Sequence, residues 1–166
     1  MAIFKEISLG ADARRQDLII TEINYVLNRN RHIIHYFGGY NILMGSIRDM
    51  IDQFYAVRHV FGKYHEIPIR HYMLSFSSEY DEATPYNAYR IGDQVAKLFR
   101  ADYQVLFAVH EEKQHPHIHF LVNTADIHDG RTISVSLKQL QDQIGYILAL
   151  PSLWSGKRPI QLKTGY

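Results

Sequence analysis

Four of the ten histidines in the chain fall within ten positions of one another, in the stretch VHEEKQHPHIHFLVN. Side chains two residues apart on a β-strand point to the same face, so His117 and His119 would share one face. If residues 103–109 and 116–124 pair as a hairpin, His110 lies opposite His117, with about 5 Å between their Cβ atoms. Three imidazoles in this arrangement predict a site for one divalent ion with open coordination positions, as catalytic metal sites have.

The ordinary interpretation of a single strand histidine is a solvent-facing or hydrogen-bonded residue, so the rest of the pattern matters. The other face of the expected hairpin carries a continuous apolar row: Val105, Phe107, Val109, Ile118, Phe120 and Val122. Helices would cover that row, which leaves the polar face to the imidazoles and Asn123. His115, at the loop edge, is expected to support the site or contact a substrate. An acid is expected to orient one imidazole, and the available carboxylates are Glu79, Asp81, Glu82 and Glu112.

The kind of ligand limits the ion and its chemistry. The chain has no cysteine, so a metal site must use histidine, carboxylates or water. Nitrogen ligation without thiolate suits manganese, zinc, cobalt or nickel, and magnesium where a phosphate completes the coordination. An open divalent ion is a Lewis acid suited to an anionic substrate such as a phosphodiester. The HExxH motif of zinc peptidases is missing, which favours the phosphodiester.

Hydrophobic periodicity and capping residues predict the elements that would position these side chains. Strands are expected at residues 2–8, 69–76, 103–109 and 116–124. Helices are expected at residues 13–28, 46–61, 85–99 and 136–150, with a glycine-rich loop or strand at 35–45. This order predicts an α+β fold in which helices cover one face of a central, mainly antiparallel sheet. We expect one domain over residues 1–150 and a basic, irregular tail over residues 151–166.

Composition leaves nucleic-acid binding open without indicating it. The net charge of +1 is too small to point to nucleic acid by itself, but it does not exclude a local basic face. The twelve tyrosines would suit stacking on bases and would equally suit a tyrosine-rich core. The sequence contains no signal-peptide pattern and no apolar run of about eighteen residues, so a cytoplasmic location without membrane insertion is expected.

Several segments together resemble a known family. The spacing H-x4-H-x-H-x-H-x3-N, from His110 to Asn123, resembles the third motif of plasmid and conjugative-element relaxases, the mobilisation nucleases of the HUH endonuclease superfamily. INYVLNRNR (23–31) is similar to the first motif of that family, with Tyr25 at its tyrosine. FGGYN (37–41) looks like the Gly-Asn segment, and RHYMLSF (70–76) like the strand that carries His71. Glu112, Arg29 and Arg31 stand where the family usually has Asp, Pro, and Lys or Thr. The resemblance spans about residues 15–150.

The resemblance implies a fold and a mechanism. The fold would be the palm of HUH endonucleases. The activity would be site- and strand-specific nicking and rejoining of DNA through a 5′-phosphotyrosine on Tyr25, with a magnesium or manganese ion held by His110, His117 and His119. The substrate would be single-stranded DNA at a transfer origin, and accessory mobilisation and coupling proteins would be partners. The arginines expected to contact DNA are Arg29, Arg31, Arg70 and Arg131.

Two alternatives remain open from the sequence. In replication initiators and small transposases of the superfamily, the tyrosine follows the histidines on a C-terminal helix, and Tyr146 would occupy that place. The chain could also be a DNA-binding regulator that has kept the fold without the chemistry.

Overall fold

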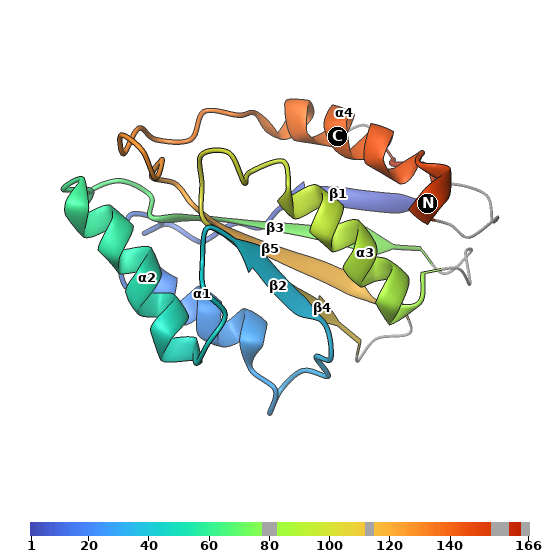
Figure 1. Ribbon diagram of the computed structural model, residues 1–166, viewed down its shortest axis with the longest axis horizontal. Helices are drawn as coiled ribbons and strands as arrows, with labels where there is room; N and C mark the ends of the chain where they lie inside the picture. The colour runs from blue at the N-terminus through green and yellow to red at the C-terminus, as the bar shows by residue number, and fades with distance from the viewer. Residues whose placement is uncertain (78–82, 112–114, 154–159, 164–166) are drawn as a thin grey trace.

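Antiparallel pairing of five strands forms the centre of the computed structural model, which describes residues 1–77, 83–111, 115–153 and 160–163 (Figure 1). The strands are β1 (Ala2–Glu6), β2 (Phe37–Tyr40), β3 (Ile69–Phe76), β4 (Val105–His110) and β5 (His117–Asn123). The helices are α1 (Leu18–Leu27), α2 (Ile47–Val60), α3 (Pro85–Ala96), α4 (Leu137–Leu148) and the short 3-10 helix η1 (Pro151–Leu153). The sheet order is β1-β3-β5-β4-β2, and every neighbouring pair is antiparallel. The α+β class and the antiparallel sheet are therefore confirmed.

The two central strands have the register that the hairpin predicts. His110 pairs with His117, and Phe107 pairs with Phe120. Every residue of β4 and β5 is buried, so both faces of this hairpin are covered. The expected register therefore holds, and the polar face is more enclosed than the sequence indicated.

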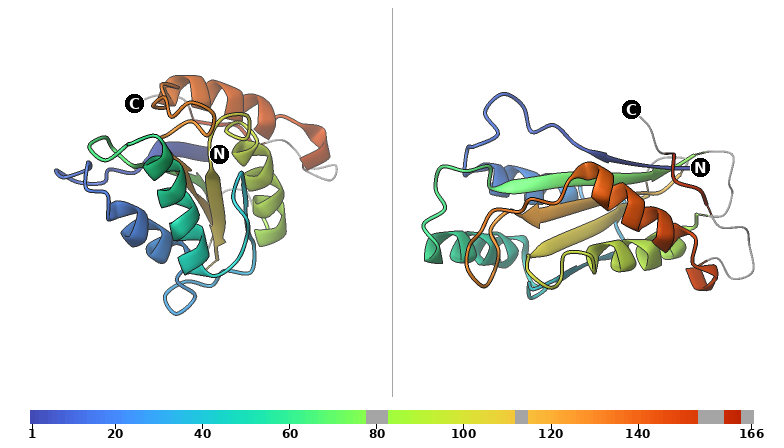
Figure 2. Two further views of the ribbon diagram at one scale, coloured as in Figure 1. Left: turned by 60° about the vertical axis from the view of Figure 1, so that its left-hand side comes forward. Right: turned by 90° about the horizontal axis from the view of Figure 1, so that it is seen from above.

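Helices lie on both sides of the sheet (Figure 2, left). The apolar row that includes Phe107 and Phe120 packs under α3 and α4, together with Ile91 and Ile144. The other face carries Leu106, Ala108 and Leu121, which pack against Ile23 and Val26 of α1 and Phe54 of α2 as a second apolar cluster. The sequence predicted helices on one face of the sheet. The structure has helices on both faces, and α1 and α2 cover the face that carries the histidines.

The helix starts follow local capping. Ser46 and Ser136 each form a capping box, with Asp49 at the start of α2 and with Gln139 at the start of α4. Thr84 accepts a hydrogen bond from the backbone of Asn87 and caps α3. The first helix begins at Leu18 instead of residue 13.

The described part of residues 151–166 packs onto the domain. Leu153 and Ile160 are buried in the larger apolar cluster. Leu162 forms a parallel bridge with Ala2, and the Lys163 amide donates a 2.8 Å hydrogen bond to the Ala2 carbonyl. Among the residues that the structure describes, no helix has the length and apolar character needed to cross a membrane.

Candidate metal centre

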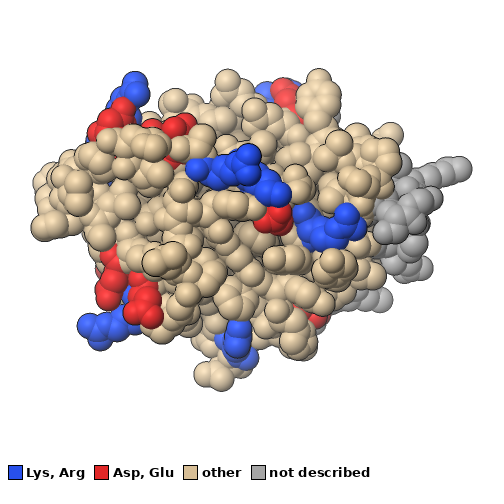
Figure 3. Space-filling model, in the orientation of Figure 1, with Lys and Arg blue, Asp and Glu red and all other residues tan. Residues whose placement is uncertain are grey.

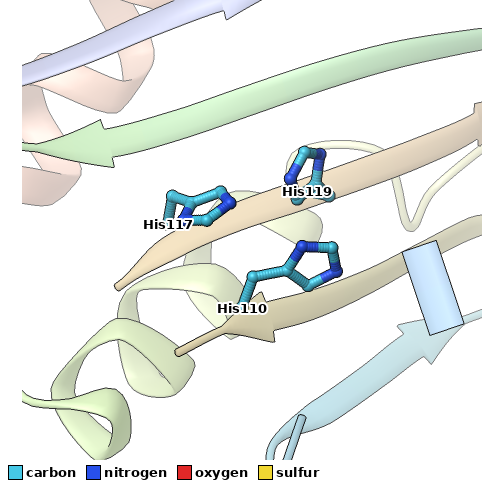
Figure 4. A group of neighbouring side chains, drawn as sticks. All are labelled: His110, His117 and His119. Atoms are coloured by element: carbon cyan, nitrogen blue, oxygen red, sulfur yellow. The ribbon is translucent and has the colours of Figure 1, made fainter. Parts of the chain in front are cut away.

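Three histidines from two adjacent strands come together on the α1 side of the sheet. The ring centroids of His110 and His119 are 4.3 Å apart, those of His117 and His119 are 5.0 Å apart, and those of His110 and His117 are 5.3 Å apart. One nitrogen from each ring lies within 4.8 Å of the other two. The side chains project from the same face of β4 and β5 (Figure 4). We call these residues the histidine triad.

Hydrogen bonds decide which ring nitrogens of the triad can bind a cation. His110 Nε2 lies 2.8 Å from the Val26 carbonyl. A carbonyl only accepts, so the neutral ring carries its proton on Nε2 and its lone pair on Nδ1. His119 Nδ1 lies 2.7 Å from His71 Nε2, whereas His119 Nε2 is buried and has no hydrogen-bond partner among the described residues. A buried nitrogen without a partner is costly, and a bound divalent ion would satisfy it. The donor set therefore fits a metal.

Burial keeps the centre of the triad neutral. Desolvation lowers the pKa of His119 far below its usual value, and repulsion from His110, His71 and His117 lowers that pKa further. Neutral imidazole is the form that binds metals. His119 is therefore already in the protonation state that binds a metal ion.

More imidazoles surround the triad than the sequence motif predicts. His32 stacks on His110, with ring centroids 4.0 Å apart and an interplanar angle of 19°. His71, on β3, contacts His119 and in turn pairs with Glu22 of α1 at 2.6 Å. From the sequence, His71 was expected here only through the family resemblance, and His32 and Glu22 were not expected at all. The available signal was the spacing of Glu22 and Tyr25, which lie three residues apart on one face of a helix.

The two candidate tyrosines lie on opposite sides of the sheet. The ring of Tyr25, in α1, has its centroid 5.9 Å from that of His119 and 5.2 Å from that of His32. It remains 41% exposed, so a substrate can reach it. Tyr146 is 79% exposed on α4, a helix that packs on the other face of the sheet. The structure brings Tyr25 to the triad and leaves Tyr146 away from it.

The other expected supporting residues are spread along the sheet. His115 is partly buried, and its Nε2 has no hydrogen-bond partner within the part of the chain that is described. The Asn123 amide donates to the Phe54 carbonyl and to Gln104, and its oxygen accepts from Arg58. Asn123 therefore supports the far end of β5. The acids proposed to orient an imidazole, which were Glu79, Asp81, Glu82 and Glu112, lie outside the described residues.

Two of the four candidate arginines lie near the triad. Arg29 and Arg31 follow the C-terminal end of α1 and flank the turn that leads to His32, and both are exposed. The Arg29 guanidinium sits 5.2 Å from the centroid of the Phe37 ring, a cation–π distance. A pocket of about 550 Å³ is lined in part by Arg29 and by three asparagines, Asn24, Asn28 and Asn30, and apolar side chains complete its wall.

The other two arginines lie toward the opposite end of the sheet. Arg70 pairs in register with Val122, and its guanidinium donates a 2.6 Å hydrogen bond to Glu6. Arg131 is exposed and pairs with Asp129 at 2.6 Å. On the side drawn in Figure 3, Lys and Arg side chains are scattered, and several lie beside acidic ones. That side does not form one basic surface in the residues described.

A second group of possible ligands is already occupied by local contacts. Asp102, Asp126 and His128 bring ligand atoms within 4.8 Å of one another. However, Asp126 accepts from the His128 backbone at 2.7 Å, and His128 Nε2 lies 3.0 Å from the Ala101 carbonyl. These bonds explain the group as a loop arrangement.

Comparison with known proteins identifies a family and a fold. A family model for the nuclease domain of MobA/VirD2-like relaxases matches residues 25–144, well over half of the chain. A solved structure concerned with the molecular basis of vancomycin resistance transfer in Staphylococcus aureus aligns with a TM-score of 0.62 at 12% identity, and the alignment covers 100% of both chains. At this identity the likeness shows the fold alone. No curated protein sequence matches significantly.

Proposed function

Because the chain belongs to the family of MobA/VirD2-like relaxase nuclease domains, we propose that it nicks and rejoins one DNA strand through a covalent intermediate on Tyr25. The family acts in DNA nicking during mobilisation. The covalent intermediate on Tyr25 and the use of a metal ion are our proposal. The observation that carries it is the edge-on contact of the Tyr25 ring with His119, at 5.9 Å between ring centroids. A nucleophile has to lie beside the group that binds the phosphate.

The proposed chemistry consists of two phosphoryl transfers, first from the 3′ oxygen of the DNA to Tyr25 and then back to a 3′-hydroxyl. The Tyr25 hydroxyl loses its proton, and its oxygen attacks the phosphorus of the scissile phosphodiester. The bond from phosphorus to the 3′ oxygen breaks, and the leaving oxygen takes up a proton to give a free 3′-hydroxyl. The phosphorus stays bonded to the 5′ oxygen of the downstream strand, so the 5′-phosphate of that strand is then linked to the Tyr25 oxygen. Attack by a 3′-hydroxyl reverses these steps and rejoins the strand without an energy source.

The triad is proposed to hold the ion. His110, His117 and His119 would bind it through neutral ring nitrogens, and a divalent ion supplies the positive charge that offsets developing charge on the phosphate oxygens. Magnesium or manganese suits a site completed by phosphate, and zinc, cobalt or nickel would also accept three nitrogens. The buried surroundings of the triad strengthen this electrostatic effect.

The proposed substrate is single-stranded DNA at a transfer origin. Arg29 and Arg31 would contact phosphates next to the triad, while Arg70 and Arg131 would contact more distant DNA. Accessory mobilisation and coupling proteins are proposed partners, and the cytoplasm is the proposed location.

A labelling experiment tests the nucleophile. The protein is incubated with manganese and a pool of single-stranded oligonucleotides labelled at their 3′ ends, and denaturing gels are used to detect labelled protein. We expect adducts with the wild type and with Tyr146→Phe, no adduct with Tyr25→Phe, and loss of adducts on chelation.

Other outcomes would favour the other functions. An adduct that persists in Tyr25→Phe and disappears in Tyr146→Phe would indicate an initiator or transposase. Binding of metal and DNA by the wild type without any adduct would indicate a regulator.

A further inference from the structure

A chain of two short hydrogen bonds ties one residue of the triad to helix α1. Glu22 Oε2 lies 2.6 Å from His71 Nδ1, and His71 Nε2 lies 2.7 Å from His119 Nδ1. His71 and His119 are 2% and 4% exposed, and the Glu22 side chain is 15% exposed. Three residues distant in sequence are thus joined in a nearly dry environment, where such bonds are strong.

The acceptor and donor atoms of the three side chains fix the direction of both hydrogen bonds. An ionised glutamate only accepts hydrogen bonds, so His71 donates from Nδ1. A neutral His71 then has its lone pair on Nε2, and His119 must donate to it from Nδ1. The remaining lone pair of His119 is therefore on Nε2. That nitrogen is buried and has no hydrogen-bond partner among the described residues.

We propose that Glu22 and His71 are positioning residues that hold His119 in the tautomer whose Nε2 is available to a divalent ion. The inference rests on the proposed function only in taking the triad as a metal site. Outer hydrogen bonds of this kind fix both the tautomer and the ring orientation of ligating histidines. Here the carboxylate of Glu22 acts on His119 through the intervening imidazole of His71. We call this arrangement the relay.

The same two hydrogen bonds also link the proposed metal site to α1, the helix that carries Tyr25. Glu22 and Tyr25 lie three residues apart in α1, and both reach the cluster: Glu22 through its bond to His71, and Tyr25 through ring contacts with His71 and His119. The His110 contact with the Val26 carbonyl adds a second attachment from the same helix. The hydrogen bonds therefore position the ligands and the tyrosine together.

A nuclear magnetic resonance measurement on the wild-type protein tests the tautomer directly. Long-range proton–nitrogen spectra of the ¹⁵N-labelled, metal-free protein distinguish protonated from bare ring nitrogens, and the spectrum of His119→Gln identifies the His119 signals. We expect a protonated Nδ1 and a bare Nε2, with Nε2 shifting when zinc is added. A proton on His119 Nε2 would overturn the inference.

Zinc affinity of variants tests whether Glu22 acts through His71. Competition with a chromophoric chelator should show binding weakened about 10- to 100-fold in His71→Ala. Glu22→Ala should weaken binding as well, and the double variant should bind as His71→Ala does. His71→Gln should recover part of the loss, because its amide oxygen can accept from His119 Nδ1. Independent, multiplying losses from the two alanine substitutions would contradict the relay.

Matched controls separate positioning from general loss of structure. Asp52→Asn and His65→Gln change an exposed acid and an exposed histidine away from the triad, and neither should alter zinc affinity. Thermal unfolding shows whether each variant folds. The tautomer measurement uses the wild-type protein, so it remains valid even if His71→Ala does not fold. None of these readouts needs DNA cleavage, so failure of the Tyr25 adduct would count against the proposed function and leave the relay intact.

Discussion

Hydrogen bonds at single residues control which atoms carry protons, both inside and outside the site. Around the triad, a backbone carbonyl selects the protonated nitrogen of His110, and a neighbouring imidazole selects that of His119. At the surface, Glu66 accepts hydrogen bonds from the Thr132 hydroxyl at 2.5 Å and from Lys63 at 3.0 Å. These two contacts favour the ionised carboxylate. Protonation then couples to stability, because the same groups are unpaired in the unfolded chain.

This coupling gives a prediction for acid stability. The hydrogen bonds from Thr132 and Lys63 lower the pKa of Glu66 from its unfolded value near 4.5. A lowered folded-state pKa stabilises the fold above the unfolded value, and the stabilisation is lost as pH falls through the folded value. Replacing Glu66 by Gln should therefore lower Tm at about pH 6.5 and have less effect at about pH 3. The loss should be at most about 1 kcal/mol, since the carboxylate is 41% exposed.

A second substitution checks the cause. Thr132→Val removes the hydrogen bond that lowers the pKa of Glu66 most. The substitution should therefore reproduce part of the same pH-dependent difference in Tm. Equal destabilisation by Glu66→Gln at both pH values would mean that the carboxylate charge is not what stabilises the fold.

At the residue scale, the sequence could predict the triad but not the approach of Glu22 and His32 to it. Parity along two strands is a local property, and it was enough to place His110 opposite His117. The approach of Glu22 and His32 depends on how α1 docks on the sheet, which is tertiary packing with no local signature. A motif therefore predicts ligands on neighbouring strands better than the residues that orient them.

At the scale of elements, the approach of α3 to the hairpin depends on one glycine. A Cβ atom on Gly92 would lie 2.9 Å from Phe107 Cδ2 and 3.2 Å from Ile118 Cγ2, both in the buried core. Gly145, in α4, would have no heavy atom within 4 Å of an added Cβ. The two helical glycines therefore form a matched pair for testing this contact.

Alanine at the two positions should have opposite effects. Gly92→Ala gains helix propensity but forces α3 away from Phe107, and we expect a net loss of about 1–2 kcal/mol in the free energy of unfolding. Gly145→Ala gains propensity without a clash and should stabilise by about 0.5–1 kcal/mol. Urea denaturation measures both. Shifts of the same sign would show that α3 can move away from the hairpin without cost.

The first helix shows where local patterns stop being informative. Its amphipathic pattern suggested a start at residue 13, but α1 begins at Leu18. The Gln16 side chain donates to the Glu66 carbonyl at 2.8 Å, and its backbone carbonyl accepts from the Tyr55 hydroxyl at 2.6 Å. These long-range bonds hold the segment before Leu18 in turns. Strand and helix positions otherwise follow periodicity and capping, which are local.

At the scale of the whole molecule, net charge says little about where DNA would lie. The total is only +1, so any attraction to phosphates must come from a local group of cations. Arg29 and Arg31 are exposed beside the triad. Arg70 and Arg131 are each engaged by a carboxylate and lie toward the other end of the sheet.

Salt dependence of binding should separate these two pairs. In a Tyr25→Phe background, which prevents cleavage, replacing Arg29 and Arg31 by Ala should weaken binding to a single-stranded oligonucleotide. It should also flatten the slope of log affinity against log salt by about 0.7 for each phosphate that the protein no longer neutralises. The Arg70 and Arg131 double alanine variant should change the slope much less, because carboxylates already offset those charges. Fluorescence anisotropy at several salt concentrations measures both, and equal effects would mean that the carboxylates do not offset the charges of Arg70 and Arg131 toward DNA.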